Sequence, residues 1–232
     1  MRAIGGGYRR PRVIFLKDND FLIKLAAWNL LDEAMGILRA KTDGVRVLDT
    51  LRTQLEEPRP DWQAQYGDAV LQKVLRFVSK VAVVDDLPFD EGELLMIGLV
   101  PKIDAGEALL FAVTKDLPTY RIVTGDKQCL YVLHGATTCK PVMDRVRGNI
   151  LHLEQVVYRL LETKGLNAIR DKIRHSPAPD ADLAIRGAFG QRWEHGSASV
   201  NGKMVASIRQ LHNDCGGLLD LSDTERDPFA AT

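Results

Sequence analysis

The sequence of 232 residues is poor in cysteine and in aromatic residues and has no excess of either charge. Its three cysteines form no CxxC pair, and an odd number fits free thiols in a reducing compartment better than a disulfide framework. Lys and Arg together number 31, as do Asp and Glu, so the summed charge attracts neither nucleic acid nor an anionic membrane. Any polyanion site must therefore be local.

Long hydrophobic runs are also missing. The apolar stretches are short and interrupted by charge, and the amino-terminal segment MRAIGGGYRRPR lacks the apolar middle of a secretory signal. We therefore expect a cytoplasmic protein that does not engage a membrane. With 45% hydrophobic residues, the chain can still bury a full core in one main domain.

A zinc site has little support. Cys129, His134, Cys139 and His152 offer suitable ligand atoms, but structural zinc sites bring their ligands in close pairs and these residues are not closely paired. We interpret the cysteines as small buried side chains.

Strand and helix patterns alternate over residues 12–165. Short apolar runs at 13–16, 45–48, 81–84 and 120–123 predict buried strands, and residues 141–143 suggest a further edge strand. Apolar residues at helical spacing predict helices over 21–39, from about 48 to the Pro58–Pro60 breaker, and over 70–78, 104–114 and 153–164. This alternation predicts an α/β fold with a doubly wound, mostly parallel sheet in a three-layer α/β/α arrangement.

The regions that flank residues 12–165 differ in character. The Gly5-Gly6-Gly7 run marks residues 1–11 as a loose leader. Residues 166–232 predict a small helical carboxyl-terminal extension, because a linker signal, SPAP, occupies 176–179 and a helical pattern at 205–211 ends at Gly216-Gly217. We expect the last ten residues, rich in Asp, Thr and Glu, to be frayed.

Two of the predicted strands lead into an acidic residue. Asp18 follows the first strand and Asp126 follows the strand at 120–123, and ligands of open α/β sheets bind beyond the carboxyl ends of the strands. Glu107 lies near the start of the helix at 104–114, so three carboxylates can meet there. Crowded carboxylates repel one another unless a cation neutralises them, and Mg²⁺ or Mn²⁺ suits oxygen ligands. Such an ion can promote phosphodiester hydrolysis.

Three segments resemble the PIN-domain nucleases, a family that includes the toxin ribonucleases of bacterial toxin–antitoxin pairs. They are VIFLKDNDFLI at 13–23, DAGEALLFA at 104–112 and IVTGDK at 122–127, similar to the family's strand-Asp-x-Asn/Ser opening, Gly-Glu-Ala helix and Thr-x-Asp strand end. The resemblance covers residues 12–160 in outline, with these segments as its specific part. It implies that Asp18, Glu107 and Asp126 are catalytic metal ligands, with the hydroxyl of Thr124 beside the last acid.

Three further positions bear on this resemblance. Asp20 stands where the family often has Asn or Ser, and we expect it to cap the helix, with a ligand oxygen as the alternative role. Two roles stay open for Asp104, which are to cap the helix or to support the metal ligands. Many members have another acid on the helix after the second strand, where this chain has Gln54. This departure counts against a second bound metal ion and against robust turnover.

The first interpretation is therefore a metal-dependent endonuclease with RNA as the substrate that the resemblance implies. Toxin-like activity would require an antitoxin-like protein that masks the site. Residues 166–232 could bind such a partner, extend the substrate groove or support a homodimer.

Two other interpretations stay open. Asp18-Asn19-Asp20 spells the Asp-x-Asp of haloacid dehalogenase-type phosphatases, in which Asp18 would be a covalent nucleophile, although Phe21 and Leu22 depart from the residues expected next. Alternatively, the chain is a catalytically impaired PIN-like module that binds RNA or protein, which Gln54 motivates. Taken singly, each acid is also explained as an ordinary turn or helix-start residue.

Overall fold

One parallel sheet organises the molecule. The structure is a computed structural model and describes residues 13–16, 18–39, 42–57 and 59–222. The strands are β1 (Val13–Leu16), β2 (Val45–Val47), β3 (Ala82–Val83), β4 (Tyr120–Thr124) and β5 (Ile150–His152), in the order β3-β2-β1-β4-β5. The chain moves outward from β1 to β3 and then returns to the other side of β1. The strand order therefore reverses between β1 and β4, the position at which such sheets bind ligands.

The strands β1, β4 and β5 face two hydrophobic clusters, because neighbouring side chains of a strand point to opposite faces of the sheet. Ile14 and Leu16 of β1 belong to one cluster, whereas Phe15 belongs to the other. In the same way, Val123 and Ile122 of β4 are divided between the two. Burial on both faces explains the continuous apolar runs of the sequence and confirms the α/β prediction with a parallel sheet.

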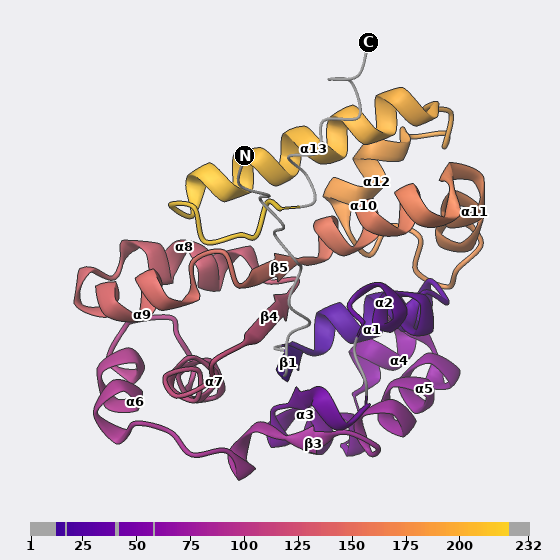
Figure 1. Cartoon of the computed structure of the whole chain (residues 1–232). Coiled ribbons are helices and arrows are strands. Elements are labelled where there is room, and N and C mark those ends of the chain that lie inside the picture. Colours follow the sequence, from indigo (N-terminus) through magenta and orange to yellow (C-terminus); the bar gives the residue numbers. More distant parts are fainter. Residues whose placement is uncertain (1–12, 17, 40–41, 58, 223–232) are drawn as a thin grey trace, which may run out of the picture.

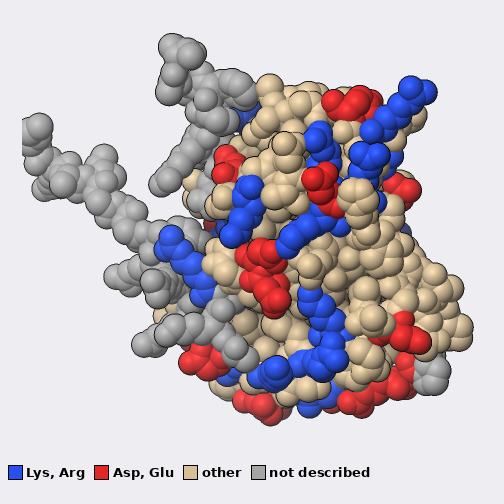
Figure 2. Space-filling view, turned by 90° about the vertical axis from the view of Figure 1, so that its right-hand side faces the viewer, with Lys and Arg blue, Asp and Glu red and all other residues tan. Residues whose placement is uncertain are grey.

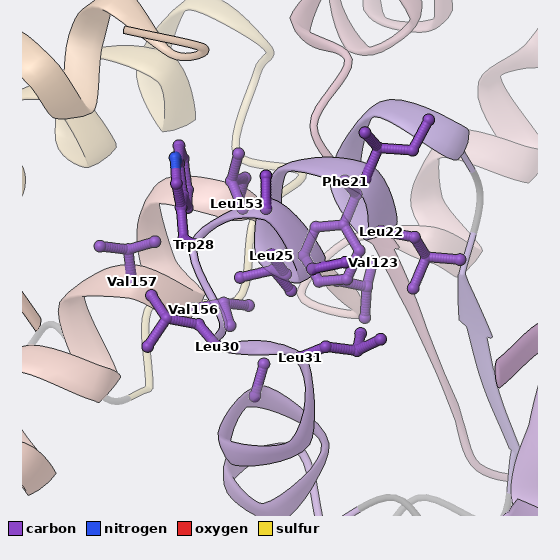
Figure 3. Packing of buried hydrophobic residues seen from close by; sticks show 14 of the residues in the cluster. Phe21, Leu22, Leu25, Trp28, Leu30, Leu31, Val123, Leu153, Val156 and Val157 are labelled. Carbon is purple, nitrogen blue, oxygen red and sulfur yellow. The ribbon is translucent and has the colours of Figure 1, made fainter. Parts of the chain in front are cut away.

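Helices cover both faces (Figure 1). The first cluster packs under α1 (Asn19–Ala27), α2 (Leu31–Ile37), α3 (Asp49–Glu56), α4 (Pro60–Tyr66), α5 (Asp68–Val78) and α10 (Leu153–Lys164). The second packs under α6 (Glu91–Gly98), α7 (Ala105–Ala112), α8 (Lys127–Gly135) and α9 (Lys140–Val146). Figure 3 shows the first cluster at close range, where Trp28 and Leu25 lie near Val156 and Val157 of α10. None of the helices described in Figure 1 has the length and apolar character needed to cross a bilayer.

The predicted helix over 21–39 is two helices in the structure. Asn29 interrupts it with a φ of 54°, a left-handed conformation that Asn adopts more readily than most residues. The apolar spacing continues through the break because Leu30, Leu31 and Ala34 still face the core. Periodicity alone therefore could not show where α1 ends.

The predicted edge strand at 141–143 is wrong, since these residues lie in α9. Pro141 occupies the first turn of that helix, where its missing N–H costs nothing. The edge strand is instead β5, whose outer side is covered by a parallel bridge between Ile150 and Leu219.

The carboxyl-terminal residues pack on the same core as the sheet. Ile173 of α11 (Leu166–Arg174), Phe189 of α12 (Leu183–Phe189) and Met204 of α13 (Ser197–Asp214) join the first cluster. Within the SPAP segment, the carbonyl oxygen of Ala178 accepts a hydrogen bond from Trp28 Nε1 at 3.0 Å. A division of the chain into domains at residue 165 stays a prediction. The expected leader at 1–11 and the last ten residues lie outside the described residues.

Candidate functional site

Asp18 joins the two central strands at their carboxyl ends. Its extended backbone makes it the cap of α1, and Oδ1 accepts a hydrogen bond from the backbone N–H of Phe21 at 2.7 Å. Oδ2 accepts from the hydroxyl of Thr124 at 2.7 Å and from the N–H of Gly125 at 2.8 Å. A carboxylate has about four lone-pair sites, and these three bonds fix its orientation while leaving one site on Oδ1.

Thr124 connects Asp18 to Asp126. Its hydroxyl donates to Asp18 and accepts from the backbone N–H of Asp126 at 2.9 Å, so both of its hydrogen-bonding functions are used. Asp126 caps α8, where Oδ1 accepts from the backbone N–H groups of Gln128 and Cys129 at 2.8 and 3.3 Å. The structure thus brings Asp18, Thr124 and Asp126 together at the point of strand reversal.

Asp20 does not cap the helix, which corrects the expectation from the sequence. Asp18 has the extended backbone that a cap requires, whereas Asp20 lies inside the first turn and pairs with Lys24 at 2.6 Å. Partial burial raises the pKa of Asp20 in spite of this partner. Burial alone would lower the pKa of Lys24, but the carboxylates of Asp182 and Asp20 outweigh it and raise that pKa. Lys24 Nζ lies 3.2 Å from Asp182 Oδ2, which ties α12 to this edge of the sheet.

Glu107 and Asp104 form a capping box at the start of α7. The N–H of Glu107 donates to Asp104 Oδ1 at 2.7 Å, and the N–H of Asp104 donates to Glu107 Oε2 at 3.0 Å. A Cβ on Gly106 would lie 2.8 Å from Leu48 Cδ1, so the helix start packs closely on the residue that follows β2. The amino end of α7 therefore lies at the same edge of the sheet as Asp18.

His152 is a buried member of the site that sequence reasoning considered only as a remote zinc ligand. Its Nδ1 lies 3.3 Å from the N–H of Glu154, which makes Nδ1 the acceptor. Nε2 therefore carries the hydrogen and donates to the carbonyl oxygen of Gly125 at 3.0 Å. Burial lowers the pKa of His152. The signal was in the register, since His152 ends β5 directly beside Thr124 of β4.

Glu154 is a fully buried carboxylate beneath the Gly125 turn. Lys127 Nζ lies 2.5 Å from Glu154 Oε1, but the pair is not aligned as a hydrogen bond, and neither oxygen has a hydrogen-bond partner among the described residues. Charge attraction to Lys127 is thus what compensates this carboxylate.

Gln54 lies on α3, and its Oε1 accepts a hydrogen bond from the side chain of Asn19 at the start of α1. It is a neutral side chain at a position where the resemblance implies an acid. The three cysteines are buried and free. Within the described ranges, no three His, Cys, Asp or Glu side chains are grouped closely enough to hold a metal ion.

The donor set nevertheless suits a hard cation. Asp18, Asp126 and the hydroxyl of Thr124 offer only oxygen atoms, and Mg²⁺ commonly binds through one or two carboxylates together with waters and substrate phosphates. Comparisons of the chain with protein-family models, curated proteins and solved structures gave no match. Asp18, Thr124 and Asp126 are therefore the basis on which a function can be proposed.

Proposed function

We propose that this chain is a metal-dependent endonuclease that hydrolyses phosphodiester bonds of RNA, with Mg²⁺ or Mn²⁺ held by Asp18 and Asp126. Glu107 is the third acid of the proposal. The observation that carries it is the hydroxyl of Thr124, which bonds the carboxylate of Asp18 and the backbone of Asp126 at once. Two acids from different strands are thereby held at the point of strand reversal.

A divalent cation, when bound, would activate a water molecule and stabilise negative charge on phosphate oxygens. The side chains of Asp18 and Asp126 contribute by being held in fixed positions. Asp18 is fixed by three hydrogen bonds and Asp126 by its capping bonds, so neither has to reorganise when a substrate arrives.

Gly125 gives the substrate room. A Cβ at this position would lie 3.4 Å from Asp20 Oδ2 and 3.7 Å from Asp18 Oδ1. With no side chain here, a phosphate group can approach the backbone of the turn between the acids. His152 holds the carbonyl oxygen of Gly125, and the same peptide unit carries the Asp126 N–H that donates to Thr124.

The test is Asp126→Asn. Asn caps helices as well as Asp does, so the variant should fold normally while losing the negative charge. Mn²⁺ should raise the melting temperature of the wild type but not that of the variant. With a structured RNA pool and Mn²⁺, the variant should not cut. The matched control is Asp43→Asn, an exposed position just before β2 at the opposite edge of the sheet, which should cut normally.

Equal cleavage by Asp126→Asn and the wild type would overturn the proposal. A second assay arm uses a generic phosphomonoester, because phosphate release through a trapped aspartyl-phosphate at Asp18 would instead support the phosphatase hypothesis.

The second candidate is an RNA- or protein-binding module without catalysis. It is favoured by the neutral Gln54 beside Asn19 and by the lack of a preformed group of three metal-binding side chains in the described part of the chain. Stabilisation of the wild type by Mn²⁺ without any RNA cleavage would support this candidate.

A further inference from the structure

Among the described residues, the carboxyl-end edge of the sheet, which carries the acids, has little positive charge to spare. Lys24 is held between Asp20 and Asp182, and Lys127 is held by Glu154. Carboxylates repel phosphates over distances of a Debye length, about 8 Å at physiological salt. A nucleic-acid substrate would therefore need to gain its affinity beside the edge rather than at it.

A cavity of about 880 Å³ lies next to this edge, lined by residues from between 180 and 203 that belong to the segment before α12, α12 itself, the following loop and α13. Its connection to the site is Asp182, which caps α12 and whose carboxylate holds Lys24. Asp180 and Leu183, on either side of Asp182 in the chain, both line the cavity. We call it the α12 cavity.

Arg186 builds one wall of the α12 cavity. Its Nε donates to Asp180 Oδ1 at 2.7 Å, its other nitrogens donate to the carbonyl oxygens of Gly190 and Gln191, and its guanidinium lies 4.3 Å from the centre of the Trp193 ring. Every nitrogen of the Arg186 guanidinium thus donates to a partner within the protein. It fixes the shape of the cavity and neutralises Asp180.

Two other cations face the cavity with their charge available. Arg192 is exposed, and no described residue accepts from its guanidinium. Lys203 Nζ lies 3.3 Å from His195 Nδ1, but that nitrogen is 2.7 Å from the carbonyl oxygen of Ala188 and donates its hydrogen there. It therefore has no lone pair for Lys203.

The other side chains that line the α12 cavity include a carboxylate and an apolar residue. Glu194 is the lining carboxylate that opposes an anion, and one of its oxygens is occupied by the backbone N–H of Arg192 at 2.7 Å. Leu183 also lines the cavity and is 82% exposed, which leaves an apolar surface against which a flat apolar group can lie. Figure 2 shows the side of the molecule to which α11 and α12 belong, where Lys and Arg are interspersed with Asp and Glu rather than forming one broad basic surface. A local cavity, not a global field, would have to select a polyanion.

We infer that the α12 cavity binds a segment of single-stranded oligonucleotide, with phosphates on Arg192 and Lys203 and a base against Leu183. Proteins that bind single strands combine a positively charged groove along the backbone with side chains, usually aromatic, on which bases stack, and in this cavity Leu183 offers the apolar surface. The inference rests on the proposed function for its substrate, because the strand would pass from this cavity to the acidic edge by way of Asp182.

The test separates binding from cleavage. A fluorescein-labelled single-stranded RNA of about ten nucleotides is titrated with protein in the presence of EDTA, and fluorescence anisotropy is measured at several salt concentrations. Arg192→Glu combined with Lys203→Glu should weaken binding at least tenfold. Lys203→Met, which keeps the apolar stem, should lower the slope of log K against log salt by about 0.7, the value for one lost contact to a single-strand phosphate. The control is Lys80→Glu, an exposed lysine just before β3 at the opposite edge, which should bind like the wild type.

Equal affinity of the double variant and the wild type would overturn the inference, as would equally tight competition by AMP, which would indicate a mononucleotide site. Cavity-dependent RNA binding in EDTA with no cleavage in Mn²⁺ would support the inference while refuting the proposed function. The double variant and Lys203→Met alter only exposed side chains, and their melting temperatures verify that they fold.

Discussion

Replacing Lys127 by Met should destabilise the fold, because it leaves the carboxylate of Glu154 buried without a compensating charge. Glu154 is fully buried, whereas the side chain of Lys127 is 35% exposed. Removing one partner of a buried ion pair typically costs about 3 to 5 kcal/mol. Since water reaches the lysine, the low end applies, and we expect a loss of about 3 kcal/mol. For a chain of this size, that lowers the melting temperature by about 6 to 12 °C.

Urea denaturation of four proteins measures this cost. Lys127→Met combined with Glu154→Met should recover most of the lost stability, because an apolar pair of similar volume has no charge to desolvate. Lys140→Met is the control. Its ion pair with Asp144 is exposed, with a separation of 3.1 Å, and should contribute no more than about 0.5 kcal/mol. A cost of Lys127→Met as small as that of the control, or a double variant no more stable than the single one, would show that Lys127 does not compensate the charge of Glu154.

Three further predictions concern the same edge of the sheet. Burial holds the folded-state pKa of His152 below its unfolded value of about 6.5, so stability is fully present above about pH 6.5 and falls as the pH decreases, by at most about 1.4 kcal/mol per pH unit. His152→Gln should flatten this acid slope in denaturation measured from pH 7.5 to 5, and an unchanged slope would contradict the assignment. Asp104→Ala should cost about 1 kcal/mol in urea denaturation through loss of the capping box, whereas Asp104→Asn should cost only a few tenths; equal costs would argue against capping. Gly125→Ala should leave the melting temperature nearly unchanged, because the added methyl makes ordinary contacts, but should reduce RNA cleavage by intruding between Asp18 and Asp20; full activity would refute an approach of phosphate at this turn.

The sequence predicted the strands that became β1, β2, β3 and β4, because strands buried on both faces are short continuous apolar runs. It also predicted α5, α7 and α10 from one-sided apolar spacing. It failed where the signal was local and ambiguous. The residues at 141–143 suggest a strand until Pro141 is placed in the first turn of a helix, and the three-residue β5 is too short to show a pattern.

Part of the candidate site could be predicted in the same way. Asp18 and Asp126 were recognisable because each follows a strand, and parallel strands bring their carboxyl ends to one edge. The cap of α1 was assigned to Asp20, whereas it is Asp18, since the choice of cap depends on which residue has an extended backbone. His152, considered only as a zinc ligand, and Glu154 were not assigned to this site because no short motif marks them.

The sequence by itself determined that this chain has an α/β fold with acids at the ends of its strands, since apolar spacing and strand-end residues are local properties. Only the tertiary structure decided that Thr124 connects the two acids, that a buried Glu154 lies beneath their turn and that Asp182, more than 150 residues from Lys24, closes the same edge. These contacts join strands and helices far apart in the chain. They depend on strand order and register, which no single segment encodes.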